Sequence, residues 1–409
     1  MSNNSVESNF SGLGIAPALL AVLSRLGYRK PTPIQEQAIP VANQGKDIVG
    51  IAQTGTGKTL AFGIPMIQRL AQVKGQGLVV LPTRELALQV DEMLGKIGRG
   101  LGLQTAVLIG GMSFGPQLRS ISRKPHIIIA TPGRLIDHLN QKNLRLDGVH
   151  IVVLDEADRM LDMGFMPQIQ KILAALPKSR QTMLFSATMP QEIMRIASSH
   201  MKLPVSVEIA PPGTTVGSVT QELFIVPREQ KISLLGKLLE TYRGPTLVFT
   251  RTKHGARKVT QQIRAMNINA AEIHSNRSLN QRREALDGFK SGRYRVLVAT
   301  DIASRGIDVM GIELVLNFDL PSTSNDYVHR IGRTARMGAG GHAITFAGPG
   351  EEREVRAIER LIRKPIPSSK LPPLPLTRTT DFFETPRERP NRPFPYRGRR
   401  QYRPSTRRF

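Results

Sequence analysis

The chain has 409 residues, of which 40% are hydrophobic and 22% are charged. This length is too great for one ordinary core and suits two domains of roughly 150–200 residues with extensions. The formal charge of +25 favours a polyanionic partner, because Lys and Arg that neutralise phosphates release counterions. A basic surface that only keeps the protein in solution has the same composition. Since the chain contains no cysteine, disulfides, thiol nucleophiles and cysteine-based zinc sites are excluded.

The sequence also bears on location. The first residues, Met1–Ser8, carry no basic segment followed by an apolar run, so we expect no signal peptide. No apolar run approaches the ~20 residues that a membrane-spanning helix needs. These features predict a cytoplasmic protein that does not contact a membrane.

In the first half of the chain, short runs rich in Val and Ile alternate with longer amphipathic segments. A helix is predicted over Thr83–Ile97, where Leu86, Val90 and Met93 fall on one apolar face. Continuous apolar strands separated by helices indicate a mostly parallel β-sheet with helices on both faces. The predicted strands are Asp47–Ala52, Gly77–Leu81, Thr105–Ile109, His126–Ala130, His150–Leu154 and Thr182–Phe185.

The second half repeats this pattern, with helices predicted over His254–Ala265 and Asn280–Phe289. We therefore expect an α/β chain of two similar domains, over residues 10–208 and 219–364, after a short extension at residues 1–9. The segment Ile209–Ser218 has the composition of a linker. The predicted strands are Thr246–Thr250, Ala270–His274, Tyr294–Ala299, Glu313–Phe318 and His342–Phe346.

A disordered tail is predicted over residues 365–409. Five prolines between Pro365 and Pro375 interrupt any helix. From Arg378 to the end there are ten Arg and three acidic residues. Such a segment holds nucleic acid by charge and stacking, or is a solvated tail with no specific role. The interleaved aromatic residues include Phe394, Tyr396, Tyr402 and Phe409.

A phosphate-binding loop is predicted from Ala52 to Thr59, after one strand and before a helical pattern. The glycines let backbone N–H groups turn toward phosphates, Lys58 can reach the β- and γ-phosphates, and the Thr59 hydroxyl can ligate Mg²⁺. The strict motif begins with Gly, whereas this loop begins with Ala52. The other loop residues expected at the nucleotide are Gln53, Thr54, Gly55, Thr56 and Gly57.

Three carboxylates follow the predicted strand His150–Leu154. Carboxylates at the carboxyl end of a buried strand are costly unless cations or donors meet them, and α/β sheets bind ligands at this edge. We expect Asp155 to hold Mg²⁺ and Glu156 to orient and deprotonate the attacking water. Acidic residues at a helix N-terminus are also common without catalysis, but the phosphate loop in the same domain favours the catalytic interpretation.

The chain resembles the DEAD-box family of ATP-dependent RNA helicases. Asp155-Glu156-Ala157-Asp158 is the motif that names the family, and its other motifs follow in order from about Phe10 to Leu361. The resemblance implies two tandem RecA-like domains that use ATP and Mg²⁺. The sequence from Asp155 to Pro190 is most similar to the bacterial RhlE-like subgroup.

The resemblance also implies an adenine site in the segment Gly27–Gln35. There Tyr28 stacks on the base and Gln35 reads its edge, while Phe10 is the isolated upstream aromatic residue. Ser186 and Thr188 resemble the motif that couples the ATP state to unwinding, through a hydrogen bond to Asp158.

RNA-backbone contacts are implied at both domains, through hydroxyls, guanidinium groups and closely approaching backbone. One departure from the family is Leu279, which stands where the family's Gln-x-x-Arg element has Gln, so the role of Arg282 is less secure. The implied RNA-binding residues are Pro82, Thr83, Arg84, Gly110, Gly111, Thr131, Gly133 and Arg134 in the first domain, and Arg251, Arg282 and Thr300 in the second.

The second domain is also implied to complete the ATP site. Arg305 and Asp308 face the nucleotide, and the segment from His329 to Arg336 resembles the arginine-finger motif, with His329 in a coupling role. Arg333 and Arg336 would stabilise charge at the γ-phosphate, so the implied catalytic residues are Lys58, Glu156, Arg333 and Arg336. Ala335 stands where many members have Gly.

The implied activity is RNA-stimulated ATP hydrolysis that unwinds short RNA duplexes and remodels RNA or ribonucleoprotein. An ATP-gated RNA clamp or annealing factor with little unwinding stays open, and so does a DNA helicase, because only 2′-hydroxyl contacts separate the two nucleic acids. A small-molecule kinase would leave the second domain unexplained. We expect a monomer whose tail meets ribosomal or RNA-decay proteins.

Overall fold

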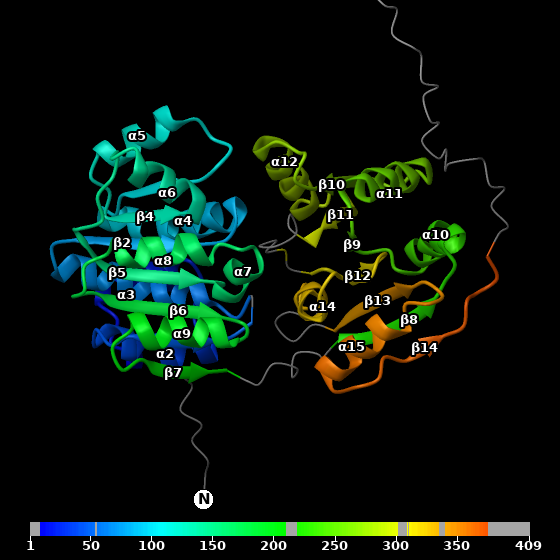
Figure 1. Ribbon diagram of the computed structural model, residues 1–409, viewed down its shortest axis with the longest axis horizontal. Helices are drawn as coiled ribbons and strands as arrows, with labels where there is room; N and C mark the ends of the chain where they lie inside the picture. Colours follow the sequence, from blue (N-terminus) through cyan, green and yellow to red (C-terminus); the bar gives the residue numbers. More distant parts are fainter. Residues whose placement is uncertain are drawn as a thin grey trace, which may run out of the picture. The chain divides into compact units, whose positions relative to one another are not determined.

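The computed structural model describes residues 9–53, 55–209, 219–301, 309, 311–334 and 340–374. In these residues the chain forms two lobes, each built around one seven-stranded parallel sheet (Figure 1). No described helix is long and apolar enough to cross a membrane. Several sequence-based predictions lie outside the described residues, namely those for Thr54, Arg305, Asp308, Arg336, the linker at 210–218 and the Arg-rich tail from 375.

The sheet of the first lobe has the order β3-β4-β2-β5-β6-β1-β7. Its strands are β1 Ile48–Ile51, β2 Gln76–Val80, β3 Thr105–Leu108, β4 Ile127–Ala130, β5 Val149–Asp155, β6 Gln181–Ser186 and β7 Val205–Glu208. Its helices are α1 Pro17–Arg25, α2 Pro33–Asn43, α3 Lys58–Gln72, α4 Arg84–Gly98, α5 Phe114–Ser122, α6 Pro132–Asn140, α7 Ala157–Asp162, α8 Met166–Ala174 and α9 Gln191–His200, with 3-10 turns η1 Phe10–Leu13 and η2 Arg99–Leu101.

Two apolar clusters cover the two faces of this sheet. Successive strand residues alternate between them, so that Val79 belongs to one cluster while Leu78 and Val80 belong to the other. Helices α2, α3 and α4 contribute to the first cluster, and α6, α7, α8 and α9 contribute to the second. A sheet buried on both faces explains why its strands are continuously apolar.

The sheet of the second lobe has the order β10-β11-β9-β12-β13-β8-β14. Counted from the first strand of each lobe, this is the same order as in the first sheet, so the two lobes share one topology. Its strands are β8 Val219–Ile225, β9 Thr246–Thr250, β10 Ala270–Ile273, β11 Val296–Thr300, β12 Leu314–Asn317, β13 Gly341–Ala347 and β14 Ser368–Ser369. Its helices are α10 Lys231–Thr241, α11 Lys253–Ala265, α12 Leu279–Lys290, α14 Ser324–Ile331 and α15 Glu352–Ile362, after the 3-10 turn η4 Arg228–Gln230.

Polar caps fix the starts of the helices that carry site residues. The Thr83 hydroxyl accepts a hydrogen bond from the N–H of Leu86 and begins α4. Ser278 and Gln281 form a reciprocal capping box at α12, and Thr323 caps α14. The cap at Thr83 explains why the helix predicted over Thr83–Ile97 is found one residue further along.

The boundary predicted at Pro365 is wrong for residues 365–374. Ile366 is buried, Ser368–Ser369 pairs with β8 as the edge strand β14, and Leu371 and Leu374 pack on the core of the second lobe. Prolines exclude a helix, but they are tolerated beside an edge strand. The ordered lobe therefore extends to residue 374, where a separate unit begins.

Candidate nucleotide and RNA sites

The phosphate loop joins β1 to α3. Gly55 and Gly57 have φ of 88° and 92°, the left-handed region that glycine adopts without strain. Lys58 is the first residue of α3 and is 5% exposed; its Nζ donates to the carbonyl oxygen of Ala52 at 3.0 Å. The loop thus presents a helix N-terminus and a buried ammonium, the elements of an anion site.

Gln35 ties the predicted adenine segment to the phosphate loop. Its Oε1 accepts from the Thr32 N–H at 3.0 Å, and its Nε2 donates to the Gly57 carbonyl oxygen at 3.0 Å. A Cβ at Gly57 would lie 2.3 Å from this Nε2 and would displace it, and the positive φ of Gly57 also favours glycine. The Gln35 Oε1 can still accept one more hydrogen bond and Nε2 can still donate one more, so the amide can pair with the edge of a base.

The two aromatic residues predicted near adenine differ in their surroundings. Tyr28 is half-buried, and its hydroxyl lies 3.5 Å from the Met93 sulfur. Phe10 is 4% exposed and packs in the core of the first lobe. Phe10 is therefore a core residue in this structure, whereas Tyr28 is partly exposed to solvent.

The acidic motif begins at the last residue of β5. Asp155 lies 3.9 Å from Lys58 Nζ, and burial raises the pKa of Asp155 to about 6 against the effect of Lys58. Glu156 caps α7 in the left-handed region at φ 55°, which costs a residue with a Cβ about 1–3 kcal/mol. A strained backbone and two buried carboxylates mark this edge of the sheet as a functional site.

Arg159 is a site residue that the sequence analysis missed. Its Nη1 lies 2.6 Å from Glu156 Oε2, and both side chains are almost fully buried. Burial alone would raise the pKa of Glu156, but Arg159 and more distant cations lower it to about 2. The sequence shows Arg159 as an ordinary helix residue, and only its burial distinguishes it.

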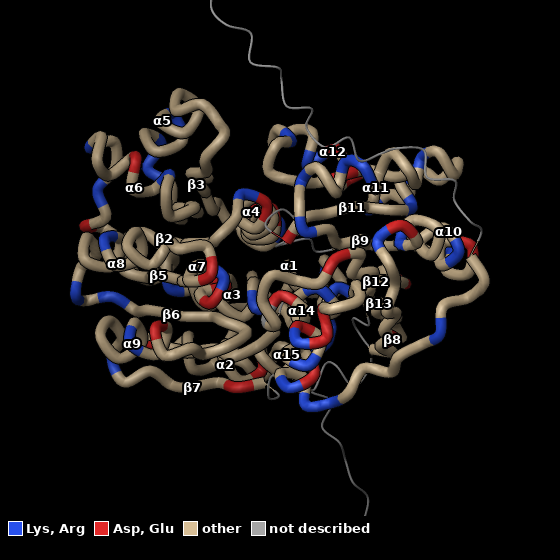
Figure 2. Tube along the Cα trace, turned by 45° about the vertical axis from the view of Figure 1, so that its right-hand side comes forward, with Lys and Arg blue, Asp and Glu red and all other residues tan. Residues whose placement is uncertain are grey.

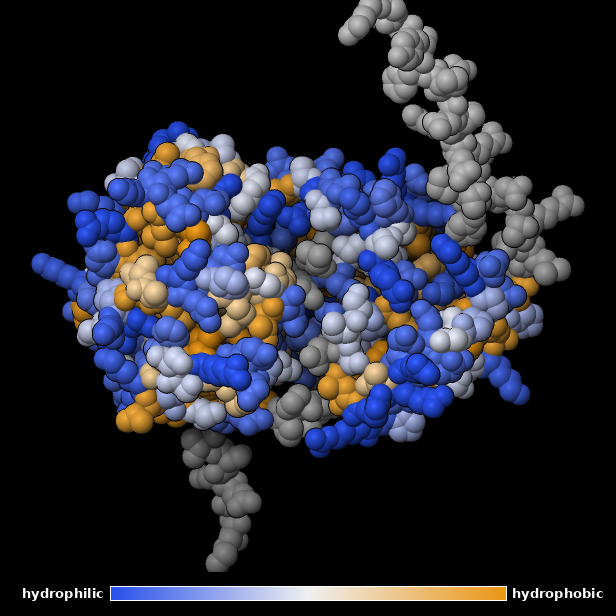
Figure 3. Space-filling model, in the orientation of Figure 1, coloured by the Kyte–Doolittle hydropathy of each residue, from blue (hydrophilic) through white to orange (hydrophobic). Residues whose placement is uncertain are grey.

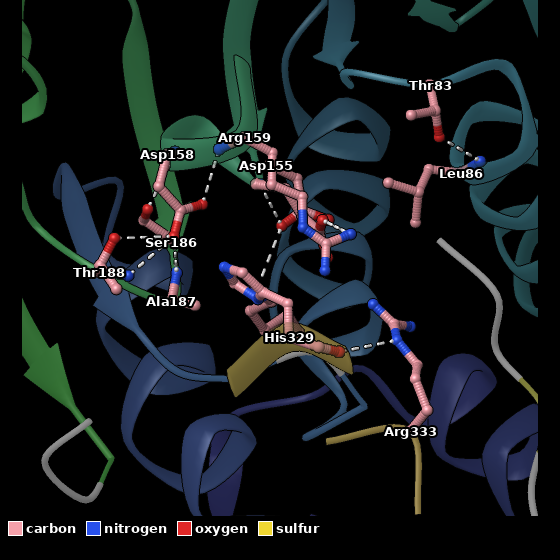
Figure 4. Close-up of polar contacts among 12 residues, drawn as sticks. Thr83, Leu86, Asp155, Asp158, Arg159, Ser186, Ala187, Thr188, His329 and Arg333 are labelled. Carbon is pink, nitrogen blue, oxygen red and sulfur yellow. Dashed lines mark hydrogen bonds and ion pairs between the residues drawn. The ribbon is translucent and has the colours of Figure 1, made fainter. Parts of the chain in front are cut away.

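Asp158 and the segment from Ser186 to Thr188 form a dense network (Figure 4). Asp158 Oδ2 accepts from the Ala187 N–H, the Thr188 N–H and the Thr188 hydroxyl at 2.9–3.1 Å. The Asp158 N–H donates to the Ser186 hydroxyl at 3.1 Å. The predicted hydrogen bond between Thr188 and Asp158 is confirmed, while its role in coupling stays a prediction.

The second lobe places two further residues at the acidic motif. His329 lies on α14 and Arg333 just after it, and Figure 4 shows both side chains directed toward the region of Asp155 and Arg159. Both residues contribute to lowering the pKa of Glu156, although Arg159 and Lys58 contribute more. Burial lowers the pKa of His329 to about 4, so its ring is neutral at neutral pH.

Arg330 is a second residue that the sequence analysis missed. It is 2% exposed and forms two hydrogen bonds with the Asp301 carboxylate, at 2.6 and 2.8 Å. Its Nη1 also donates to Asn317 Oδ1 and to the Asp319 carbonyl oxygen. This guanidinium anchors α14, and with it His329, to the sheet of the second lobe.

The predicted RNA residues of the first lobe cluster at the carboxyl ends of its strands. The Arg84 guanidinium lies over Gly110 and Gly111, where a Cβ would approach it to 3.2 and 2.2 Å. Thr83 and Thr131 begin helices α4 and α6, so each sits at a positive helix end. Pro82 is buried beside Thr83, and Gly133 has open space beside its Cα.

Basic side chains converge on this cluster. Burial and, to a smaller extent, the charges of Arg282 and Arg134 lower the pKa of Arg84, so the three guanidinium groups act on one another. Arg134 Nη1 donates to the Met112 carbonyl oxygen at 2.8 Å. Guanidinium groups gathered beside helix N-termini suit a phosphate backbone.

The predicted RNA residues of the second lobe lie on neighbouring strands. Thr300 ends β11 and is paired in register with Thr250, which precedes Arg251. The Arg251 N–H donates to Asp319, and its Nη2 lies 3.3 Å from Glu351. These residues share the carboxyl edge of the second sheet.

Arg282 contacts the first lobe directly. Its Nη2 lies 2.7 Å from Glu85 Oε1, and both side chains are only 9% exposed. Leu279, one turn earlier on α12, packs against the core of the first lobe. The residue whose RNA role was least secure thus joins the two lobes next to Arg84.

Known proteins resemble this chain over most of its length. Residues 32–196 match the DEAD/DEAH box helicase family and residues 230–338 match the helicase conserved C-terminal domain. The chain is 44% identical to the DEAD-box ATP-dependent RNA helicase CshA of Geobacillus kaustophilus, over 90% of this chain and 79% of that protein. It is 42% identical to the ATP-dependent rRNA helicase RRP3 of Eremothecium gossypii, over 89% and 76% of the two chains. The solved structure of Dbp5 from S. cerevisiae bound to RNA and ADP BeF3 is similar at a TM-score of 0.79 and 29% identity, over 90% and 96% of the two chains.

The chain therefore belongs to the family of DEAD-box ATP-dependent RNA helicases. It is an enzyme that acts on RNA with hydrolysis of ATP, and its two lobes are RecA-like domains. The RhlE-like subgroup predicted from the sequence around Asp155 stays a prediction.

Proposed function

We propose that the two lobes share one hydrolysis site. In the first lobe, Lys58 and the phosphate loop bind the triphosphate while Glu156 orients the attacking water. From the second lobe, Arg333 stabilises the charge that develops during transfer. The observation that carries this proposal is that Arg333 and His329 of the second lobe are directed toward the acidic motif. They lie near enough to add to the larger effects of Arg159 and Lys58 on the pKa of Glu156.

The acidic motif fits a divalent cation. Burial holds the pKa of Asp155 near 6 although Lys58 lies close, so this carboxylate lacks full compensation by the protein. No group of three or more acidic or His side chains among the described residues forms a metal cage. Mg²⁺ is commonly held by one or two carboxylates together with substrate phosphates. Asp155 and the Thr59 hydroxyl would hold Mg²⁺, which would neutralise charge on the phosphates.

RNA is proposed to cross both lobes along one basic edge. Thr83, Arg84 and Arg134 supply contacts from the first lobe, and Arg251 and Thr300 supply them from the second. Because the triphosphate and the RNA would each contact both lobes, binding of one favours the arrangement that binds the other.

Steady-state ATP hydrolysis with and without RNA tests this coupling. We expect a rate that rises with RNA and that rises less with DNA of the same sequence, because only RNA offers 2′-hydroxyl groups. A rate that does not depend on RNA would contradict the proposal.

Three further expectations from the sequence stay predictions. These are a monomeric state, a cytoplasmic location and contacts between the tail and ribosomal or RNA-decay proteins. Sedimentation of the purified chain tests the first, and a fit to a dimer mass would overturn it.

A further inference from the structure

Helix α15 presents a basic face that the nucleotide and RNA motifs do not include. Its buried residues Val355 and Ile358 face the core of the second lobe. On the opposite side, Arg353, Arg356 and Arg360 follow one another at helical spacing and are all exposed. Arg363 and Lys364 continue this row just past the helix end. These five cations are called the α15 basic face below.

The cations of the α15 basic face have no carboxylate within ion-pair distance in the part of the chain that is described. Some exposed cations on other helices are paired, as in Lys96 with Glu92 at 2.8 Å and Lys237 with Glu240 at 3.7 Å. The one acidic residue that lines the hollow here, Glu359, accepts a hydrogen bond from the Ile366 N–H at 2.9 Å. Glu352, one turn before Arg356, lies near enough to interact with it electrostatically. The five cations still outnumber Glu352 and Glu359, and this net positive charge favours an external anion.

The α15 basic face also has a shape that can receive a ligand. It lines an open hollow of about 690 Å³ together with Glu359 and Pro365. Figure 2 marks Lys and Arg positions along α15 in blue, and Figure 3 shows strongly hydrophilic side chains gathered over this helix. Five cations around one hollow form a compact site for phosphate groups.

Its position connects this face to the predicted RNA path. Glu351, which caps α15, lies 3.3 Å from Arg251, the residue expected to meet RNA at the end of β9. The helix then leads away from Arg251 for 11 residues, or about 16 Å at 1.5 Å per residue. A single-stranded RNA that passes Arg251 and continues along α15 would meet the basic face.

We propose that the α15 basic face binds the phosphate backbone of single-stranded RNA outside the groove formed by the helicase motifs. This inference rests on the proposed RNA path at Arg251. The face carries no aromatic residue, so it contacts the backbone without reading bases. It extends the length of RNA that the protein holds and leaves the hydrolysis site unchanged.

The test compares the full chain with the variant R353Q/R356Q/R360Q, which keeps helix propensity and side-chain length while removing three charges. The matched control is K142Q/K171Q/K178Q, which removes three exposed charges from the first lobe. Binding to single strands of about six and about sixteen nucleotides, the span of known single-strand site sizes, is measured over a range of salt concentrations.

For the longer strand, we expect the α15 variant to bind at least several-fold more weakly. Its plot of the logarithm of the binding constant against the logarithm of the salt concentration should be shallower by up to about 2, because each of three lost phosphate contacts contributes about 0.7 to the slope. Binding of the short strand and hydrolysis stimulated by it should match the full chain, as should the control variant throughout. An unchanged affinity and salt slope of the α15 variant for the longer strand would overturn the inference. So would a variant that binds anionic lipid vesicles more weakly than the full chain but binds the longer RNA equally well. If the full chain itself shows no RNA-stimulated hydrolysis, the proposed function fails instead.

Discussion

Glu156 carries the most constrained side chain of the site. Its backbone lies in the left-handed region, and its carboxylate is buried 2.6 Å from Arg159. Although burial opposes ionisation, the surrounding cations keep the pKa of Glu156 near 2, so the carboxylate is charged at neutral pH. A fixed anion at the end of β5 can orient a water molecule without rearranging.

Two substitutions at the hydrolysis site should separate binding from turnover. Glu156→Gln keeps the shape of the side chain but removes its charge, so ATP affinity should stay within about twofold and turnover should fall by about 10²–10⁴-fold. Lys58→Ala removes the phosphate contact itself, so ATP binding should be lost. Titration with a fluorescent ATP analogue and steady-state hydrolysis measure both; equal turnover in Glu156→Gln and the unchanged protein would refute the assignment.

Arg159 should act by positioning Glu156. Arg159→Gln leaves Glu156 buried without its main cation, so the pKa of Glu156 should rise and the acid limb of the kcat profile should move to higher pH. Arg159→Lys, which keeps a charge, should restore part of the original profile. A uniform fall in kcat at every pH, with no shift of the limb, would indicate that Arg159 has only a structural role.

Burial explains why the sequence analysis found some residues and missed others. Lys58, Asp155 and Glu156 belong to motifs whose residue types and spacing in the sequence already indicate their chemistry. Arginine usually lies at the protein surface, so the sequence does not single out Arg159 and Arg330. Only the folded structure shows that each is at most 2% exposed and paired with a carboxylate.

At the scale of elements, α14 depends on one buried guanidinium. Arg330 holds Asp301, Asn317 and the Asp319 carbonyl oxygen at once. Its removal breaks the contacts that tie α14 to the partly buried Asp301 carboxylate and to the sheet, so the orientation of His329 and Arg333 should depend on it.

Arg330→Leu should therefore destabilise the protein by about 3–5 kcal/mol, the usual consequence of breaking a buried ion pair. The matched control is Arg293→Leu, which breaks an exposed pair with Glu284 and should change stability by less than about 1 kcal/mol. Urea unfolding of both variants gives the comparison. Equal stabilities of the two variants would contradict the anchoring role of Arg330.

Most of the strands predicted from the sequence lie inside a sheet, where runs such as Ile127–Ala130 are buried on both faces. The edge strands β3 and β10 were predicted as well. The sequence did not predict β7 and β14, each at one edge of its sheet, nor β8, which lies between β13 and β14. Ser368–Ser369 carries no apolar signal, and only its pairing with β8 makes it a strand. Tertiary pairing also corrected the boundary at Pro365, because proline content alone does not distinguish an edge segment from a disordered tail.

At the scale of the whole molecule, one topology occurs twice and the two copies have different tasks. The first sheet carries the phosphate loop and the acidic motif, while the second carries His329 and Arg333. The ion pair between Glu85 and Arg282 joins the lobes on the RNA side. The sequence predicted this division of tasks but not the ion pair.

A double-mutant cycle tests whether that ion pair couples the lobes. Glu85→Ala and Arg282→Ala should each reduce RNA-stimulated hydrolysis. The double variant should differ from the sum of the single effects by about 0.5–3 kcal/mol in activation free energy, as expected for residues in contact. Purely additive effects would show that the contact plays no part in coupling.

The central claim is that one triphosphate is held between groups from both lobes, and Arg333 tests it most directly. With saturating RNA, Arg333→Ala should bind an ATP analogue nearly as well as the unchanged protein and hydrolyse ATP about 10³-fold more slowly or worse, the usual contribution of an arginine that meets the γ-phosphate. If Arg333→Ala instead hydrolyses ATP at the rate of the unchanged protein, the second lobe takes no part in the chemistry and the shared site is wrong.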